Sequence, residues 1–489
     1  MDQTQTPLFS ALRRHAGSGP VQFHIPGHKK GAGMDLEFRQ FMGDNALSID
    51  LINIAPLDDL HNPAGVILEA QRLAAEAFGA DYTFFSVQGT SGAIMAMIMS
   101  VVGEGDKILV PRNVHKSVMT AIILAGALPV FIPPVMDRRI GISHGITVQE
   151  VERALDLHPD ARAVLIINPT YFGVAANLRE IVRIAHGRRV PVIVDEAHGV
   201  HVHFHDDLPL SAMQAGADMA ATSVHKLGGS LTQSSILNVR RGLVDPKRVQ
   251  ALLSMLTTTS TSYLLLASLD AARRNLAVNG SAALERTIRL AQEARRRINE
   301  ISGLYCFGEE ILDSEAAYDL DPTKLTIHVR ELGITGYEAE KWLRKHYNIE
   351  VELSDLYNLL CIVTPGDTEA EIDLLVKALR RLAEENANPK AARDIIVRMP
   401  QIPRLALSPR DAFYAATESV PLKEADGRII AEFIMVYPPG IPILMPGEII
   451  TRENIEYIEE HLRVGLSVQG PEDKTIGNVK VIVETSAIP

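Results

Sequence analysis

The stretch "PVIVDEAHG" (Pro191–Gly199) is an apolar run that ends in two acids and a histidine. Its apolar residues follow one another without alternation, as is typical of a strand buried on both faces of a parallel sheet. Segments of the same kind are "YTFFSV" (82–87), "KILVP" (107–111), "LPVFIP" (128–133), "AVLIIN" (163–168) and "MAATSV" (219–224). Helix-like segments separate most of them, so the sequence predicts an open α/β fold with a mainly parallel sheet.

The chain has 489 residues, which is too long for a single hydrophobic core. We expect an irregular N-terminal arm, a large domain that holds the sheet, a smaller α/β domain and a C-terminal domain. Their ranges are 1–60, 61–300, 301–385 and 386–489. In the smaller domain we expect strands at 325–329, 349–353 and 359–364 and helices at 337–347 and 369–385. The stretch "NANPKAARD" (386–394) has the composition of a linker.

The composition narrows the possible partners and locations. A formal net charge of −12 argues against a surface that binds nucleic acid. Two cysteines, Cys306 and Cys361, do not make a disulfide framework or a metal-binding spacing, and they favour a reducing, cytoplasmic location. The N-terminal segment lacks the apolar core of a signal peptide, and "AIMAMIMSVV" (93–102) is too short to span a membrane.

Polar residues follow the predicted strands, where ligands bind in open α/β sheets. The turn "QGTSG" (Gln88–Gly92) offers backbone N–H groups and the hydroxyls of Thr90 and Ser91 at the start of a helix. These groups suit one phosphate, and a simple helix N-cap is the alternative. Asp195 is either a solvated acid at a strand end or an anion that faces a protonated ring nitrogen. His198, three residues later, is placed to line the same pocket.

A second polar segment, "TSVHKLGGSLTQSS", contains one lysine, Lys226, directly after an apolar strand. A partly desolvated lysine has a lowered pKa and forms Schiff bases with carbonyl groups, whereas a solvated lysine needs no such surroundings. Ser223, His225 and Thr232 are candidate phosphate donors. Gly228 and Gly229 are expected to leave room for a bulky ligand.

Taken together, these features match the needs of pyridoxal 5′-phosphate. That cofactor requires a Schiff-base lysine, an anion at its pyridine nitrogen and a phosphate cup, for which Lys226, Asp195 and the turn at 88–92 are the candidates. In "RNVHKS" (112–117), His115 lies at the start of a helix that follows a strand. An imidazole there either stacks on the cofactor ring or serves only as a helix cap.

Seven stretches resemble, in order, motifs of the Orn/Lys/Arg decarboxylase family: "FHIPGHKKG", "VQGTSG", "PRNVHKS", "NPTYFG", "DEAHG", "TSVHKLGGSLTQSS" and "YPPGIPILMPGE". The resemblance covers nearly the whole chain and implies the aspartate-aminotransferase-like fold of the type I pyridoxal-phosphate enzymes. It implies that Lys226 carries the cofactor as a Schiff base, that Asp195 pairs with the pyridine nitrogen and that His115 stacks on the ring. The residues that it places around the phosphate are Gly89, Thr90, Ser91, Ser223 and His225.

The resemblance also implies an activity, the decarboxylation of L-arginine to agmatine and CO2 for polyamine (putrescine and spermidine) biosynthesis. It implies a homodimer or a larger even assembly with the active site at the subunit interface, to which the N-terminal arm is a candidate contributor. His198 stands where longer members commonly have a tryptophan, and either Lys226 or His198 returns a proton to Cα. The alternatives are decarboxylation of lysine or ornithine, another pyridoxal-phosphate activity such as acyl transfer, and a non-catalytic regulatory role.

Two further groups of residues are candidates for binding. His201, His203 and His205 alternate in "HGVHVHFHDD", and on a strand they would share one face and suit a metal ion. Because the cofactor already accounts for the chemistry, we expect no metal. Acids that could meet a basic substrate side chain, but that we expect to be solvated, are Asp58, Asp59, Glu352, Asp355 and Glu448.

Overall fold

The computed structural model describes residues 1–386, 400–437, 441–463 and 467–483. It divides into two compact units. The first holds Met1–Val101 and Val182–Leu284, and the second holds Val102–Ile181 and Glu285–Pro489. Two of the division points fall inside helices, α8 (Leu178–Gly187) and α12 (Tyr263–Asn299). The predicted linker at 386–394 lies outside the described residues except for Asn386.

Four strands of the first unit lie in the order β1 (Tyr82–Ser86), β10 (Ser235–Val239), β9 (Met219–Thr222) and β8 (Val192–Asp195). Strands β8 and β9 are parallel, and β10 is antiparallel to both of its neighbours. Every residue of β8 and β9 is buried, which confirms the reading of their continuous apolar runs. Strand β10 was not predicted, because two polar residues interrupt its apolar pattern.

Helices make up most of the rest of the first unit. They are α1 (Pro7–Gly17), α2 (Leu36–Met42), α3 (Asp44–Ile49), α4 (Val66–Ala77), α5 (Gly89–Val101), α9 (Ala212–Ala215), α10 (Val224–Leu227) and α11 (Pro246–Leu256). The expectation that the first 60 residues are irregular is therefore wrong. Local signals explain two of these helices: a proline opens α1, and the Asp35 side chain accepts a hydrogen bond from the Phe38 N–H at the start of α2.

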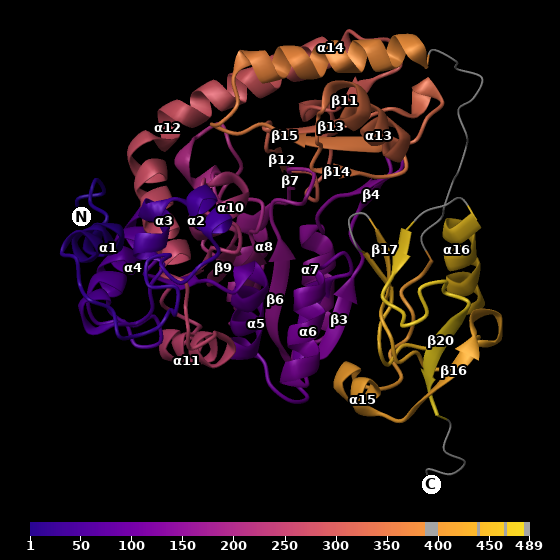
Figure 1. The fold of residues 1–489 in the computed structure, drawn as a ribbon. Helices are drawn as coiled ribbons and strands as arrows, with labels where there is room; N and C mark the ends of the chain where they lie inside the picture. Colours follow the sequence, from indigo (N-terminus) through magenta and orange to yellow (C-terminus); the bar gives the residue numbers. More distant parts are fainter. Residues whose placement is uncertain (387–399, 438–440, 464–466, 484–489) are drawn as a thin grey trace. The chain divides into compact units, whose positions relative to one another are not determined.

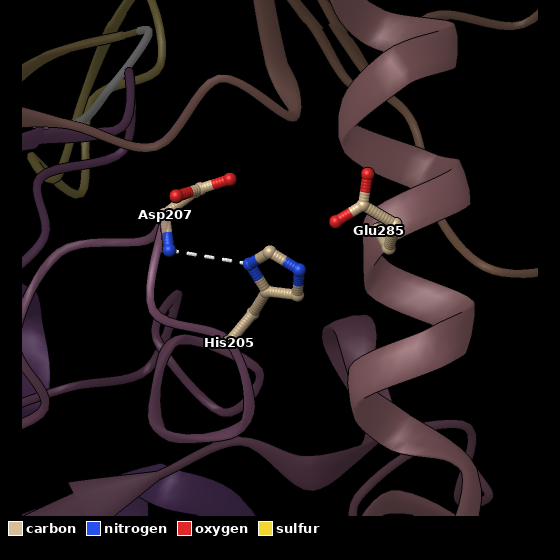
Figure 2. Close-up of side chains that lie close together, drawn as sticks. All are labelled: His205, Asp207 and Glu285. Atoms are coloured by element: carbon tan, nitrogen blue, oxygen red, sulfur yellow. Dashed lines mark hydrogen bonds between the residues drawn. The ribbon is translucent and has the colours of Figure 1, made fainter.

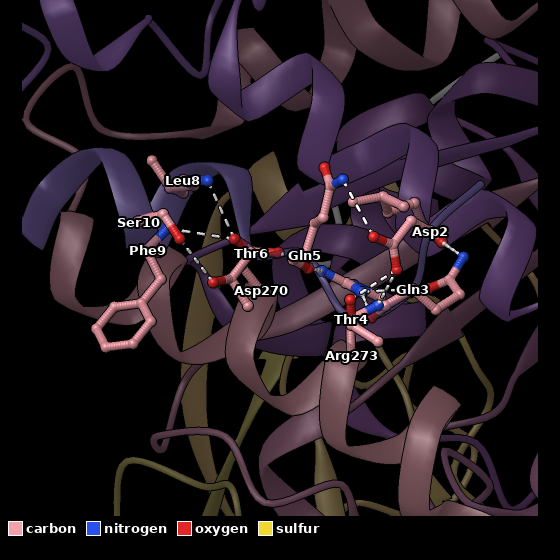
Figure 3. A network of polar contacts seen from close by, with 11 residues as sticks. Asp2, Gln3, Thr4, Gln5, Thr6, Leu8, Phe9, Ser10, Asp270 and Arg273 are labelled. Atoms are coloured by element: carbon pink, nitrogen blue, oxygen red, sulfur yellow. Dashed lines mark hydrogen bonds and ion pairs between the residues drawn. The ribbon is translucent and has the colours of Figure 1, made fainter.

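The N-terminus is held by a buried pair on α12, Asp270 and Arg273 (Figure 3). Asp270 accepts hydrogen bonds from the backbone N–H groups of Leu8 and Phe9 at 3.0 and 3.2 Å, and so caps α1. Arg273 donates to the carbonyl oxygen of Gln3 at 2.8 Å and to the Asp270 carboxylate at 2.7 Å. These contacts tie the start of the chain to a helix that begins some 250 residues later.

The second unit contains three parallel strands in the order β6 (Ala161–Ile167), β2 (Lys107–Pro111) and β3 (Leu128–Ile132). Helices α6 (Lys116–Ala125) and α7 (Val148–Leu157) connect them. All three strands were predicted. The parallel pairs in both units confirm the predicted α/β class with mainly parallel strands.

The same unit contains a smaller antiparallel sheet in the order β11 (Tyr305–Cys306), β13 (Lys324–His328), β15 (Asn358–Ile362) and β14 (Leu353–Ser354). Helices α13 (Gly336–Tyr347) and α14 (Glu369–Glu385) share one hydrophobic core with it (Figure 1). The strand expected at 349–353 is mostly wrong, since only its last residue lies in β14. Glu350 instead turns back to pair with Arg344 of α13.

The C-terminal part has its own core, formed by α16 (Arg452–Arg463) and the strands around it. Among the described residues, the remaining strands and the remaining α-helix of the second unit are β4 (Met136–Asp137), β5 (Ile142–Ser143), β7 (Val174–Ala175), β12 (Asp319–Leu320), α15 (Pro409–Tyr414), β16 (Thr417–Pro421), β17 (Ile434–Tyr437), β18 (Ile441–Leu444), β19 (Ser467–Gln469) and β20 (Asn478–Ile482). Among the residues that the structure describes, no helix combines the length and the apolar character that crossing a membrane requires.

Candidate active site

The carboxyl ends of β8 and β9 carry most of the predicted site residues. Because the two strands are parallel neighbours, these ends lie at the same edge of the sheet. Asp195 is the last residue of β8, and Ser223 follows β9 as the N-cap of α10. Both side chains are buried, with 5% and 2% of their surface exposed. Helix α10 then carries His225 and Lys226, so the sequence places all four residues at one edge.

Lys226 and His198 are in direct contact. The Lys226 Nζ atom lies 2.7 Å from Nε2 of His198, whose ring is buried. A hydrogen bond at this distance requires a lone pair on one of the two nitrogen atoms, so the pair holds a proton between two basic groups. The structure thus brings together the two residues that were the candidates for returning a proton to the substrate.

Three buried hydroxyl groups meet at the start of α5. The Thr90 hydroxyl forms hydrogen bonds with the hydroxyls of Ser223 and Ser235, the latter at 2.8 Å. Gly89 has a φ of +67°, and its N–H donates to the carbonyl oxygen of Gln233 at 2.9 Å, which closes the turn onto the loop before β10. Sequence reasoning missed Ser235, for which the only signal was its place in the stretch "TQSS".

Two other side chains predicted to bind the phosphate are Ser91 and His225. Ser91 follows Thr90 on α5 and is partly exposed. His225 lies with Nδ1 2.9 Å from the carbonyl oxygen of Ser234, and because a carbonyl only accepts, Nδ1 carries the proton. The Nε2 atom of His225 is therefore a donor to an anion only when the ring is protonated.

The two glycines after Lys226 have different roles. A Cβ atom on Gly228 would lie 2.7 Å from the carbonyl oxygen of Val224 and 3.2 Å from the side chain of Val200. The missing side chain of Gly228 is therefore needed for packing within the protein, and close approach of a ligand at this glycine stays a prediction. Gly229 has a φ of +81° and open space where its Cβ would lie, as ligand clearance requires.

His115 lies in the second unit. It is the N-cap of α6, where its Nδ1 accepts a hydrogen bond from the N–H of Ser117 at 3.2 Å. The ring is exposed. The helix-cap reading accounts for these contacts, and stacking on the cofactor ring stays a prediction.

The three alternating histidines do not lie on a strand, so the condition for their sharing one face is not met. His201 precedes a 3-10 helix, Val202–Phe204, which includes His203. The His203 Nδ1 atom lies 2.9 Å from the hydroxyl of Ser211. His205 accepts a hydrogen bond from the N–H of Asp207 at 3.2 Å (Figure 2). Glu285, which Figure 2 also labels, belongs to the second unit.

The acids that we expected to be solvated are mostly engaged within the protein. Asp58 accepts hydrogen bonds from backbone N–H groups at the start of α4, and Asp59 accepts one from the N–H two residues on. Glu352 is exposed but accepts a hydrogen bond from the hydroxyl of a nearby tyrosine at 2.6 Å. Burial raises the pKa of Asp355 to about 6. Glu448 is fully buried in an ion pair, so solvation is the wrong description for it.

Comparison with known proteins places these features in a family. The model "Orn/Lys/Arg decarboxylase, major domain" matches residues 6–371, and the model "Orn/Lys/Arg decarboxylase, C-terminal domain" matches residues 390–481. The arginine decarboxylase of Halalkalibacterium halodurans is 70% identical over 99% of both chains, and that of Bacillus subtilis is 66% identical over 100% of both. The lysine decarboxylase LdcF of Francisella novicida has a similar structure, with a TM-score of 0.86 and 25% identity over 98% of this chain and 81% of its own.

Proposed function

The chain belongs to the Orn/Lys/Arg decarboxylase family, and we propose that it decarboxylates L-arginine to agmatine and CO2 with pyridoxal 5′-phosphate as its cofactor. The substrate assignment rests on two relatives of at least 66% identity, both described as arginine decarboxylases. The observation that carries the chemistry is the contact of Lys226 with His198 at the strand edge where Asp195 ends β8. Agmatine is a precursor for polyamine synthesis.

The residues at this edge suit the cofactor. A buried carboxylate, a partly buried lysine and a cluster of hydroxyls at a helix start provide an anion, an amine and phosphate donors. When bound, pyridoxal phosphate supplies a conjugated ring that accepts the electron pair left by a broken Cα–carboxylate bond. Gly89, Thr90, Ser91, Ser223 and His225 are the candidates to hold its phosphate.

Each polar residue then has a distinct task. Lys226 would hold the cofactor covalently through Nζ, as a partly buried lysine amine is suited to do. Asp195 would favour a proton on the pyridine nitrogen of the bound cofactor, because a buried carboxylate stabilises a positive charge next to it. His198, 2.7 Å from Nζ, accepts or donates a proton at Nε2, which makes it the partner of Lys226 in returning a proton to Cα.

We also infer that the active enzyme is a homodimer, or a larger even assembly, with the N-terminal segment in the interface. Residues 21–41 expose six large apolar side chains, and in α2 no residue is buried. The six are Val21, Phe23, Ile25, Leu36, Phe38 and Phe41. Such a concentration of exposed apolar surface is unusual for a monomer and supports a protein partner. Both cysteines are free thiols, which supports a reducing, cytoplasmic location.

The test is to incubate the purified protein and pyridoxal phosphate with L-arginine, L-lysine and L-ornithine, and to measure CO2 and the amine product. We expect arginine to be strongly preferred, and preference for lysine or ornithine would reject the substrate. Release of CO2 from none of the three would favour a regulatory role or a different pyridoxal-phosphate reaction. Lys226→Ala should abolish the visible absorbance of the bound cofactor, whereas Lys423→Ala, at a lysine with 82% of its side chain exposed, should not.

A further inference from the structure

Glu196 is a buried acid whose role the proposed reaction leaves open. It follows Asp195, and only 3% of its surface is exposed. One oxygen accepts a hydrogen bond from the hydroxyl of Thr222 at 3.1 Å, and the other accepts one from the N–H of Ala212 at 2.6 Å. Both partners are buried as well. Burial raises the pKa of Glu196 to about 7, so near neutral pH this carboxyl need not add a second full charge beside Asp195.

The sheet register explains why this acid reaches Thr222. Asp195 lies opposite Ala221 in the parallel β8–β9 pair, and the N–H of Glu196 donates to the carbonyl oxygen of Ala221 at 3.0 Å, which extends the ladder by one residue. Consecutive side chains of a strand point to opposite faces. Glu196 and Thr222 therefore meet on one face, while Asp195 and Ser223 belong to the other.

A second contact fixes the same acid from another direction. Ala212 is the first residue of α9, and its N–H has no partner within the helix. Ser211 caps this helix, and its hydroxyl also lies 2.9 Å from Nδ1 of His203. Glu196 thus links the ends of two strands to a capped helix, and His203, first considered as a metal ligand, supports that cap.

We propose that Glu196 is a positioning residue for the decarboxylation. Its two hydrogen bonds hold the ends of β8 and β9 together on the face opposite Asp195, so that Asp195 and Lys226 keep their places at the cofactor site. The proposal rests on the proposed function. The carboxylate spans the two strands within one residue of Asp195 on β8, and Thr222 precedes the helix that carries Lys226 by two residues. Loss of the bridge frees both strand ends together.

The test compares Glu196→Ala with Glu196→Gln. Glutamine keeps an acceptor for the Ala212 N–H and a partner for the Thr222 hydroxyl, so its cofactor affinity should stay within about twofold of wild type. Alanine removes both contacts and should weaken cofactor binding by about 10- to 100-fold, by analogy with the effect of losing the hydrogen-bond partners that orient metal ligands. Affinity is read from the visible absorbance of pyridoxal phosphate added to cofactor-free protein, without substrate.

Asp218 provides a matched control. It is also a buried acid of the first unit, and it accepts a hydrogen bond from the N–H of Val192 at 2.8 Å, which ties together the starts of β8 and β9. Asp218→Ala should lower the unfolding temperature but leave cofactor affinity near that of wild type. If Glu196→Ala behaves like Asp218→Ala, or if Glu196→Gln binds as weakly as Glu196→Ala, the proposal is wrong.

A milder variant, Thr222→Val, tests the proposal even if Glu196→Ala does not fold. Thr222→Val keeps the shape of the side chain and removes one of the two hydrogen bonds, so it should weaken cofactor binding in the same direction. Unchanged affinity in Thr222→Val would contradict the bridge. Wild-type protein that binds the cofactor but does not decarboxylate arginine would refute the substrate and leave the role of Glu196 standing. Wild-type protein that does not bind the cofactor would refute both.

Discussion

Replacing Glu448 with alanine should destabilise the protein by about 3–5 kcal/mol, because the change leaves a buried guanidinium without its counter-charge. In the second unit, Arg112 donates to the two carboxylate oxygens of Glu448 at 2.6 and 2.8 Å. Only 4% of the Arg112 side chain and 1% of the Glu448 side chain are exposed. Water therefore does not screen the lost charge, as it does for an ion pair at the surface.

Other contacts of Arg112 reduce the loss of stability expected in Glu448→Ala. Its Nε and NH2 groups also donate to the carbonyl oxygens of Pro442 and Ile443, each at 3.0 Å, and its guanidinium lies 4.6 Å from the centre of the Phe131 ring. These contacts persist after the carboxylate is removed. They satisfy part of the guanidinium but supply no negative charge, so most of the desolvation cost of the cation remains.

The assay is thermal and urea unfolding of wild type, Glu448→Ala and the double variant Arg112→Met/Glu448→Met. Replacing both charges with apolar side chains should restore most of the lost stability, since a buried pair is close to neutral against hydrophobic groups of similar size. Glu456→Ala is the control within the same unit. It breaks an ion pair with Arg452 in which both side chains are more than 60% exposed, and it should change stability by at most about 1 kcal/mol.

Two results would refute the reasoning. A loss in Glu448→Ala no larger than that in Glu456→Ala would mean that burial does not strengthen the pair. A double variant as unstable as Glu448→Ala would mean that the loss comes from packing and not from an unpaired buried charge on Arg112. Because a chain of several domains need not unfold in one step, the comparison uses shifts of the first transition.

Three further predictions concern other parts of the chain. Burial raises the pKa of Glu196 from 4.5 to about 7, so its protonation stabilises the folded state at low pH, and roughly 3 kcal/mol should be lost as the pH rises from about 4.5 to 7. Urea melts across this range should show a steeper loss of stability in wild type than in Glu196→Gln, in which other buried acids such as Asp355 still titrate. Asp270→Ala removes the cap of α1 and leaves the buried Arg273 without its counter-charge. Amide hydrogen exchange in α1 should therefore accelerate by at least about tenfold, whereas exchange in α16 should not change. In Gly447→Ala, where the backbone φ is +96°, the new Cβ would lie 2.4 Å from a backbone oxygen, so the variant should be less stable than wild type by more than about 1 kcal/mol. Gly427→Ala, at a φ of +79° but with open space around the new Cβ, should lose less stability.

The strands that could be predicted are those that are buried on both faces, because such strands appear in the sequence as continuous runs of apolar residues. Strand β10 escaped because its two polar residues have buried partners elsewhere in the chain: the Thr83 hydroxyl donates to the side-chain oxygen of Asn238 at 2.6 Å, and the Ser235 hydroxyl lies 2.8 Å from that of Thr90. A polar residue with a buried partner on another strand looks like a loop residue when only one sequence is read. Helix α1 escaped in part for a related reason, since the acid that bonds its first N–H groups, Asp270, lies far away in the chain.

The candidate site was predictable where it depends on strand order. Parallel neighbours bring their carboxyl ends to one edge, so Asp195, Ser223 and Lys226 could be placed together from the sequence. Partners that depend on distant folding could not be placed. Arg112 and Glu448 are 336 residues apart, and neither is unusual in its local sequence.

The two adjacent acids at the end of β8, Asp195 and Glu196, show why composition alone misleads at such an edge. Read as "DE", they look like one acidic feature, yet the alternation of a strand sends the side chains to opposite faces. Asp195 then lies on the same face as Ser223, whereas Glu196 is held on the other face by Thr222 and Ala212. It follows that Asp195→Asn should alter the bound cofactor without loosening the strands, and that Glu196→Ala should alter the cofactor only because it loosens them. Equal effects of both changes on strand stability would contradict this division.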